Sequence, residues 1–231
     1  MLKIEGLNQY YGQSHTLWDL DLSAPEGECT VLMGRNGVGK TTLLQCIMGL
    51  LPIKSGVMQY GEHDLRKVNA ESRARLGIGY VPQGRQIFPL MTVEENLLIG
   101  LPARRDGLRK VPDFIYELFP VLKEMLGRRG GDLSGGQQQQ LAIGRALVTD
   151  PKLLILDEPT EGIQPNIVAE IGGIVRKLNR EMGLTVLLVE QKLPFARKVA
   201  DRFCLLDRGR AVATGMMDEL NEELIQQYLT V

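Results

Sequence analysis

The chain is poor in the residues that mark secreted, membrane-spanning or metal-cluster proteins. It has three cysteines and two histidines in 231 residues. Cys29, Cys46 and Cys204 are scattered and lie in apolar runs, which predicts core residues in a reducing compartment rather than a disulfide framework or a metal cluster. No apolar run approaches the roughly 18–20 residues that cross a bilayer, and the chain begins as a strand without a signal peptide. We therefore expect any work at a membrane to depend on a partner.

The charges are nearly balanced. The formal net charge is −1 at pH 7, so the composition gives no reason to expect nucleic acid as a partner. The length is enough to bury a large core, in one domain or in two closely joined lobes. His15 and His63, the two histidines, are expected to lie on the surface, and both are far in sequence from the switch position described below.

One nine-residue stretch fits the pattern G-x-x-x-x-G-K-[ST] without a mismatch, between a short β-prone run and a helix. Its glycines let the backbone wrap around a phosphate chain, Lys40 supplies a positive charge for the terminal phosphates, and the Thr41 hydroxyl is placed to ligate Mg²⁺. The helix presents its positive N-terminal end to the same anion. The predicted nucleoside triphosphate site comprises Gly34, Arg35, Asn36, Gly37, Val38, Gly39, Lys40, Thr41 and Thr42.

A second helix start suited to an anion follows about a hundred residues later. Its serine is a good N-cap, and the two glycines after it leave backbone N–H groups uncovered. One nucleotide needs only one P-loop. This second helix start is therefore either an ordinary capped surface helix or a contact to a nucleotide that another subunit holds. The residues concerned are Ser134, Gly135, Gly136 and Gln137.

The run Leu-Ser-Gly-Gly-Gln at 133–137 matches the signature of the ATP-binding-cassette (ABC) ATPases, and the chain resembles that family from end to end. The apolar run 153–156, followed by Asp157 and Glu158, looks like the family's Walker B strand. The resemblance implies that Asp157 holds Mg²⁺ through water and that Glu158 polarises the attacking water as general base. It makes ATP and Mg²⁺ the expected ligands.

Two single residues also fall in the family's order. Tyr11 stands where the family carries an aromatic side chain that stacks on adenine, with an ordinary strand-end tyrosine as the alternative. Gln83 looks like the Q-loop glutamine, whose amide reaches Mg²⁺ or the attacking water. By resemblance, Gln83 therefore serves both as a metal ligand and in catalysis.

Two positions depart from the family pattern. The D-loop usually ends in Ala-Leu-Asp, whereas this chain has Gly-Ile-Gln at 162–164. The switch histidine expected after the strand 184–189 is replaced by Gln191, which donates an amide N–H to a γ-phosphate but carries no proton or positive charge. The catalytic set is therefore expected to be Glu158, Gln191 and Gln83, in a site that turns over more slowly than one with histidine.

The order of elements, taken with the resemblance, predicts an α/β P-loop NTPase fold with a RecA-like core, an N-terminal antiparallel β subdomain and an inserted helical subdomain. A single ABC ATPase domain is expected over 1–231. Residues 1–83 and 140–231 would form the nucleotide-binding core, and residues 84–139 would form the helical insertion that carries the signature and contacts a membrane subunit.

Local patterns refine this expectation. Thr92–Glu95 predicts a capping box, and an apolar stripe over 114–126 predicts a helix kinked at Pro120. The basic stretch 103–110 is expected to be a solvated loop, with a lipid contact as the alternative. An amphipathic helix is expected to begin at Pro165, and the short helix near the C-terminus leaves no room for a regulatory domain.

Several segments resemble one branch of the family, the smaller ATPase of the branched-chain amino-acid and amide importers, and Thr-Glu-Gly-Ile-Gln-Pro at 160–165 is most similar to the urea-importing members. The resemblance implies a peripheral subunit on the cytoplasmic face of a bacterial inner membrane. Its partners would be a second ATPase subunit, two membrane permease subunits and, indirectly, a solute-binding protein. A homodimer in isolation stays open.

The sequence thus predicts an ATP hydrolase that energises import of urea or short amides. A branched-chain amino-acid importer is the first alternative. A soluble ABC ATPase acting on ribosomes or DNA is the alternative from another class. Such proteins usually carry two cassettes or a long coiled-coil insertion, and this chain has neither. A P-loop kinase or GTPase is disfavoured because neither needs the signature.

Overall fold

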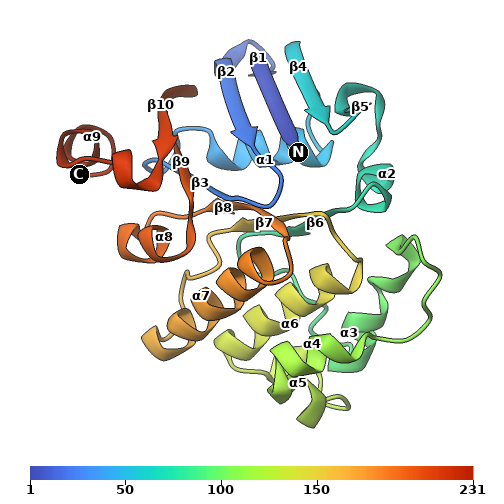
Figure 1. Ribbon diagram of the computed structural model, residues 1–231. Coiled ribbons are helices and arrows are strands. Elements are labelled where there is room, and N and C mark those ends of the chain that lie inside the picture. The colour runs from blue at the N-terminus through green and yellow to red at the C-terminus, as the bar shows by residue number, and fades with distance from the viewer. Residues whose placement is uncertain (231) are drawn as a thin grey trace.

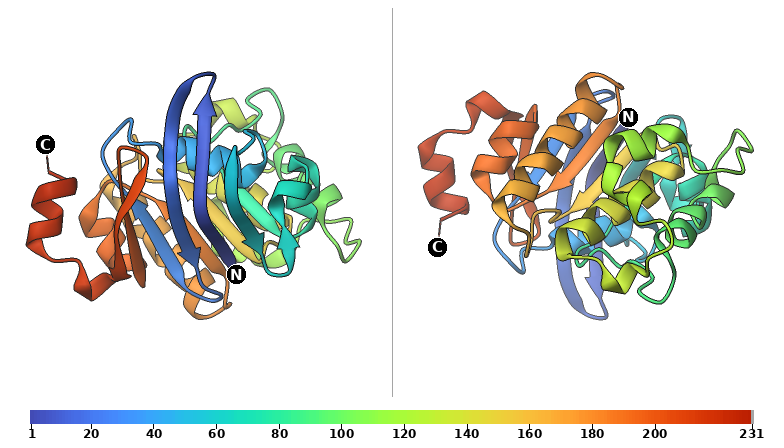
Figure 2. Two further views of the ribbon diagram at one scale, coloured as in Figure 1. Left: turned by 90° about the horizontal axis from the view of Figure 1, so that it is seen from above. Right: turned by 90° about the horizontal axis from the view of Figure 1, so that it is seen from below.

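Two β-sheets organise the computed structural model, which describes residues 1–230 (Figures 1 and 2). The larger sheet contains β3 (Cys29–Met33), β6 (Ile78–Val81), β7 (Leu153–Asp157), β8 (Thr185–Val189), β9 (Arg202–Asp207) and β10 (Arg210–Met216). Its strand order is β10-β9-β3-β8-β7-β6, and every neighbouring pair is parallel except β9 with β10. Because β3 and β7 both belong to this sheet, the P-loop and the two carboxylates emerge at the same edge.

The smaller sheet is antiparallel and is formed mainly from the N-terminal segment. It contains β1 (Leu2–Tyr11), β2 (Ser14–Ala24), β4 (Ser55–Tyr60) and β5 (His63–Asp64), in the order β2-β1-β4-β5. Figure 2 shows this sheet lying across one side of the larger one. Along β1 the inward residues alternate with exposed ones, the period expected of a strand with one buried face.

The α-helices of the described chain lie on both faces of the larger sheet. They are α1 (Lys40–Met48), α2 (Ala70–Arg75), α3 (Val93–Leu98), α4 (Asp113–Leu118), α5 (Pro120–Glu124), α6 (Gly135–Val148), α7 (Pro165–Arg180), α8 (Leu193–Val199) and α9 (Glu222–Tyr228). The segment between β6 and α6 is helical and carries α3, α4 and α5. The predicted α/β fold, with its antiparallel subdomain and inserted helices, is confirmed.

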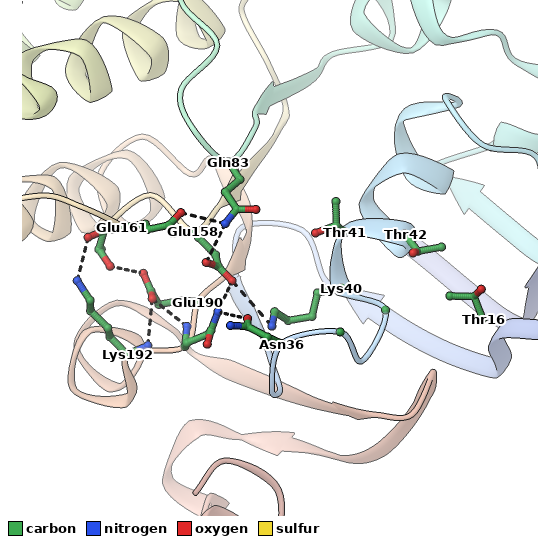
Figure 3. A pocket seen from close by; sticks show the side chains of 14 residues that line it. Thr16, Asn36, Lys40, Thr41, Thr42, Gln83, Glu158, Glu161, Glu190 and Lys192 are labelled. Atoms are coloured by element: carbon green, nitrogen blue, oxygen red, sulfur yellow. Dashed lines mark hydrogen bonds and ion pairs between the residues drawn. The ribbon is translucent and has the colours of Figure 1, made fainter. Parts of the chain in front are cut away.

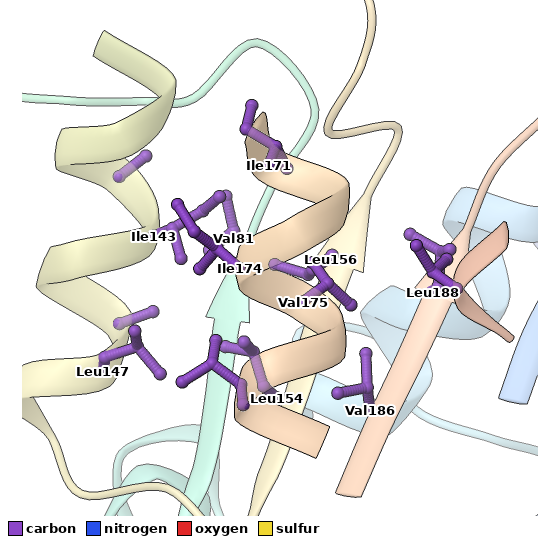
Figure 4. Close-up of a cluster of buried hydrophobic side chains, with 14 of the residues drawn as sticks. Val81, Ile143, Leu147, Leu154, Leu156, Ile171, Ile174, Val175, Val186 and Leu188 are labelled. Carbon is purple, nitrogen blue, oxygen red and sulfur yellow. The ribbon is translucent and has the colours of Figure 1, made fainter. Parts of the chain in front are cut away.

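The larger sheet separates two hydrophobic clusters. Along β7, Leu154 and Leu156 face the cluster that contains α6 and α7 (Figure 4), whereas Leu153 and Ile155 face α1 and the antiparallel sheet. All five residues of β7 are buried, as the continuous apolar run predicts for a strand covered on both faces. The strand that ends in Asp157 is therefore held rigidly from both sides.

The helix boundaries follow the local signals in most places. Thr92 forms the predicted capping box with Glu95, and α7 begins at Pro165. The predicted kinked helix is instead two short helices, α4 and α5, because Pro120 begins a new helix after the non-helical Phe119. The predicted boundary between residues 139 and 140 falls inside α6, which continues across it.

One further expectation needs correction. His15 is not a free surface residue: it is half-buried, and its ring stacks between the rings of Tyr10 and Trp18. The basic stretch 103–110 is mostly exposed, as expected of a solvated loop. Its one departure is Arg104, whose side chain is only 7 % exposed because its guanidinium pairs with Asp106 and donates to the carbonyl of Val148. Within residues 1–230, no helix combines the length and the apolar character needed to span a bilayer.

Candidate functional site

The loop between β3 and α1 forms one wall of a cavity of about 720 Å³. Its backbone requires glycine at two positions. A Cβ on Gly34 would lie 2.3 Å from the carbonyl oxygen of Leu206, and Gly39, the N-cap of α1, has a φ of 111°. The predicted residues Asn36, Gly37, Gly39, Lys40, Thr41 and Thr42 all line this cavity. The loop therefore presents the N-terminus of α1 to the cavity, as an anion site requires.

Lys40 places a positive charge in the wall of the cavity. Its side chain is 6 % exposed, and its ammonium donates to the carbonyl oxygens of Gly34 at 2.7 Å and Arg35 at 3.0 Å. Glu158 Oε1 lies 3.8 Å from the same nitrogen. Burial lowers the pKa of Lys40, and the carboxylates around it oppose that shift. The Lys40 ammonium thus bonds back to carbonyls of its own loop, and it faces Glu158, the general base predicted from the sequence.

Asp157 is the last residue of β7, and its side chain is buried. Its Oδ2 has no hydrogen-bond partner within residues 1–230. Burial raises the pKa of Asp157 to about 6, and the negative charge of Glu158 adds to this shift. The Gln83 backbone N–H, the charge of Lys40 and the Tyr80 hydroxyl act in the opposite direction and lower the pKa. A buried carboxylate oxygen without a partner is costly unless a cation satisfies it. Mg²⁺ binds few protein oxygens and keeps several waters, so this unpartnered oxygen fits such an ion.

Glu158 lies between the side-chain amides of Gln83 and Gln191, and Figure 3 shows Gln83 beside it. Its backbone has a φ of 46°, a conformation that non-glycine residues seldom adopt, and its N–H donates to the carbonyl of Val189. On one side, Gln83 Nε2 lies 3.4 Å from Oε2 of Glu158. On the other side, Gln191 Nε2 donates to Oε1 of Glu158 and, at 2.7 Å, to Oδ1 of Asn36. The structure therefore brings together the carboxylate and both glutamines predicted from the sequence.

Sequence reasoning missed five polar residues at the cavity. Glu161 accepts a bond of 2.9 Å from Gln83 Nε2, and the other four that line the cavity are Thr16, Thr160, Glu190 and Lys192. All except Thr16 stand within three residues of a predicted site residue, so proximity in sequence was the available signal. A glutamate at the end of a strand is typically solvated, whereas the exposed fraction of Glu190 is 2 %.

The signature residues lie apart from this cavity. Ser134 caps α6, with its side chain accepting from the backbone N–H of Gln137, while the Gln137 side chain accepts from the Ser134 N–H. None of the residues 134–137 lines the cavity that contains Lys40. A capped helix start outside the chain's own cavity agrees with a contact to another subunit's nucleotide.

Tyr11, the predicted adenine-stacking residue, lies at the edge of the site. Its side chain is 48 % exposed, and its hydroxyl is 3.5 Å from Oγ1 of Thr42 and 3.3 Å from Oε1 of Gln45. The ring is therefore accessible next to α1, but it is not part of the cavity wall. Stacking on a base stays a prediction.

Comparison with known proteins places this site in context. The family model for "ABC transporter" matches residues 17–161. The high-affinity branched-chain amino acid transport ATP-binding protein BraG of Pseudomonas aeruginosa is 42 % identical over 232 residues, covering 99 % of both chains. A probable branched-chain amino acid transport ATP-binding protein, LivF of Archaeoglobus fulgidus, is 36 % identical over 96 % of this chain and 94 % of its own.

Solved structures agree with these relatives. The ATP-binding cassette MJ1267 superimposes with a TM-score of 0.85 at 28 % identity, over 98 % of this chain and 97 % of that one. The cassette MJ0796, described as a dimer bound to ADP and Pi after hydrolysis, gives a TM-score of 0.84 at 26 % identity, over 94 % and 99 %. With the P-loop, the paired carboxylates and the signature helix in place, this chain belongs to the ABC transporter family and is an ABC transporter ATPase.

Proposed function

We propose that this chain is the ATP-hydrolysing subunit of a bacterial importer and that its own cavity binds Mg·ATP. The observation that carries the proposal is the convergence on Glu158. Lys40, Gln83 and Gln191 all point at this one carboxylate from three different segments. A base held between donors at a phosphate-binding loop is suited to orient an attacking water.

Each side chain has a separate task in this proposal. The N–H groups of the loop and the Lys40 ammonium bind the β- and γ-phosphates. Glu158 accepts a proton from the attacking water, and Gln191 donates its amide N–H toward the γ-phosphate once the nucleotide displaces it from Glu158. Mg²⁺, held by Thr41, Gln83 and Asp157, would supply positive charge to the phosphate oxygens. The β7 strand keeps both carboxylates in register with the loop.

We infer that the working form is a dimer of two cassettes joined head to tail. The signature residues 134–137 lie outside the chain's own cavity, so they are free to complete a site on a partner, and a structural neighbour is described as a dimer. The partner proposed is a second ATPase subunit, with a homodimer as the alternative in isolation. Two permease subunits would hold this pair at the cytoplasmic face of the inner membrane, with a solute-binding protein on the other side.

The proposed solute is a branched-chain amino acid. BraG and LivF, which carry that solute in their names, match this chain over nearly its full length. They favour the alternative of the sequence analysis over its first choice, urea. The Thr-Glu-Gly-Ile-Gln-Pro segment keeps urea or a short amide as the second candidate, since it is the observation on which that resemblance depends.

Transport by reconstituted vesicles tests this proposal. The chain would be combined with the proposed second ATPase subunit, permeases and binding protein, and ATP-driven uptake of labelled leucine and of labelled urea would be measured. Glu158→Gln serves as the control, because it keeps the size of the side chain and removes the base. ATP-driven leucine uptake that Glu158→Gln lowers supports the proposal. Uptake of urea alone would overturn the solute, and failure of the chain to bind any permease would overturn the transport function.

A further inference from the structure

Behind the catalytic carboxylate lies a buried acid that the proposed mechanism does not use. Glu190, the residue after β8, is 2 % exposed, and its carboxylate forms no ion pair within residues 1–230. A buried carboxylate without a cation is costly unless its oxygens accept several hydrogen bonds. The identity of those donors therefore indicates what the residue does.

The donors come from two loops of the site. Oε1 accepts from the backbone N–H groups of Gln191 at 2.8 Å and Lys192 at 3.0 Å. Oε2 accepts from the hydroxyl of Thr160 at 2.7 Å. The Lys192 ammonium returns to the carbonyl of Thr160 at 2.8 Å, which closes a ring of hydrogen bonds between the two loops. We call Thr160, Glu190 and Lys192 the clamp; Figure 3 shows Glu190 and Lys192 on the side of Glu158 opposite Lys40.

The clamp lies next to Gln191, the residue at the switch position. Gln191 lies on the short turn between β8 and α8, and the N-cap of α8 makes no side-chain capping bond. Within residues 1–230, Gln191 is held by the hydrogen bond from its backbone N–H to Glu190 and by its side-chain bonds to Glu158 and Asn36. Because an amide has no charge to draw it toward a phosphate, its position has to be set by the backbone.

We infer that Glu190 is a positioning residue for ATP hydrolysis. Its carboxylate ties the turn at Gln191 to Thr160, the residue that leads into the D-loop, and so aligns the switch amide with Glu158 and the bound γ-phosphate. Thr160 is completely buried and is bonded through its hydroxyl to Glu190 and through its carbonyl to Lys192, so the clamp ties the two loops together. This inference depends on the roles proposed above for Glu158 and Gln191.

Steady-state ATP hydrolysis by variants of the full-length chain tests the clamp. Where the chain alone is inactive, the second ATPase subunit is added with its own site disabled, so that only this chain's site contributes to turnover. Glu190→Ala is expected to lower kcat by about 10–100-fold and to leave the KM for ATP within about threefold, since misplacing a reacting group affects the chemical step. In Glu190→Gln, the amide oxygen still accepts from both backbone N–H donors, and the amide N–H donates to the Thr160 hydroxyl. This variant is expected to keep at least about a third of the wild-type kcat.

A double-variant experiment separates positioning from general damage. If Glu190 acts through Gln191, then adding Glu190→Ala to Gln191→Ala should cost less than about twofold more. Thr160→Val should also lower kcat, and adding it to Gln191→Ala should likewise cost less than about twofold more. Thr160→Val serves as the test variant if Glu190→Ala fails to fold. Thr185→Val, the same substitution at a buried position on β8 away from the clamp, should leave kcat unchanged.

The outcomes are distinguishable. Losses from Glu190→Ala and Gln191→Ala that multiply, a raised KM at constant kcat, or full activity of Thr160→Val would each overturn the positioning role. Glu158→Gln in the same series monitors the proposed function. If it leaves turnover unchanged, the proposed site is wrong. If it stops turnover while the clamp variants stay fully active, the site is right and the clamp inference is wrong.

Discussion

Replacing Asp157 by asparagine is expected to stabilise the protein in the absence of nucleotide. The carboxylate is 3 % exposed, and its Oδ2 has no partner in the described chain. Burial and the charge of Glu158 raise its pKa from 3.8 to about 6. The folded protein therefore holds a negative charge that the unfolded chain accommodates more easily in water. Asparagine keeps the shape of the side chain and removes this charge.

The raised pKa of Asp157 gives the size and the pH dependence of the effect. A difference of about 2 pH units corresponds to about 3 kcal/mol, at about 1.4 kcal/mol per unit. Between pH 3.8 and 6 the folded state binds a proton that the unfolded state has lost, so the free energy of unfolding falls as pH rises. Above about pH 6 both states are ionised. The advantage of asparagine is thus about 3 kcal/mol at pH 7.5 and about half that at pH 5.

Urea unfolding in EDTA, at pH 5 and at pH 7.5, measures this difference. Asp218→Asn is the matched control, because that aspartate is exposed and the same substitution there should change stability by less than about 0.5 kcal/mol at either pH. Adding Mg·ATP should stabilise wild type more than Asp157→Asn. A variant less stable than wild type at pH 7.5, or an advantage that does not change with pH, would refute the argument from burial.

Three further predictions concern the nucleotide. Lys40→Ala should weaken ATP binding by about 10–100-fold with the fold retained, since charged hydrogen bonds to phosphate are lost; equal affinity in titration calorimetry would contradict it. Glu158→Gln should associate with the partner ATPase in ATP and separate in ADP, as followed by sizing chromatography. Because Gln191 lacks a charge, the composite site that contains it should be about 10²–10³-fold slower than a site with a charged switch residue. Glu158→Gln in this chain should therefore reduce mixed-dimer turnover less than the equivalent change in the partner. Ser134→Arg in this chain, which disrupts the partner's faster site, should nearly stop turnover. Equal losses from the two glutamate changes would refute the Gln191 argument.

Much of the fold was predictable because its signals are local. The P-loop has a spacing that backbone geometry imposes, the four apolar residues before Asp157 indicate a strand buried on both faces, and Ser134 marks a helix start by its own side chain. The break at Pro120 was located correctly, but its outcome, two helices instead of one kinked helix, depends on the backbone angles of Phe119.

The parts that sequence reasoning missed are contacts between distant segments. Glu161 and Gln83 are 78 positions apart, and Glu190 and Thr160 are 30 apart. No periodicity or motif relates such pairs, because their distance is set by the packing of β6, β7 and β8 side by side. The stacking of His15 between two aromatic rings is missed for a similar reason, since it depends on the register shifts in the β1–β2 pair.

The most direct test of the central claim, that this chain's own cavity binds and hydrolyses ATP with Glu158 as base, is single-turnover hydrolysis by wild type and Glu158→Gln at equal ATP occupancy. The enzyme would be in excess of labelled Mg·ATP, with the partner subunit carrying a disabled site. We expect Glu158→Gln to bind ATP within about threefold of wild type and to hydrolyse it about 10²–10⁴-fold more slowly, the contribution of a positioned base. Equal hydrolysis rates for the two proteins at full occupancy would contradict the account.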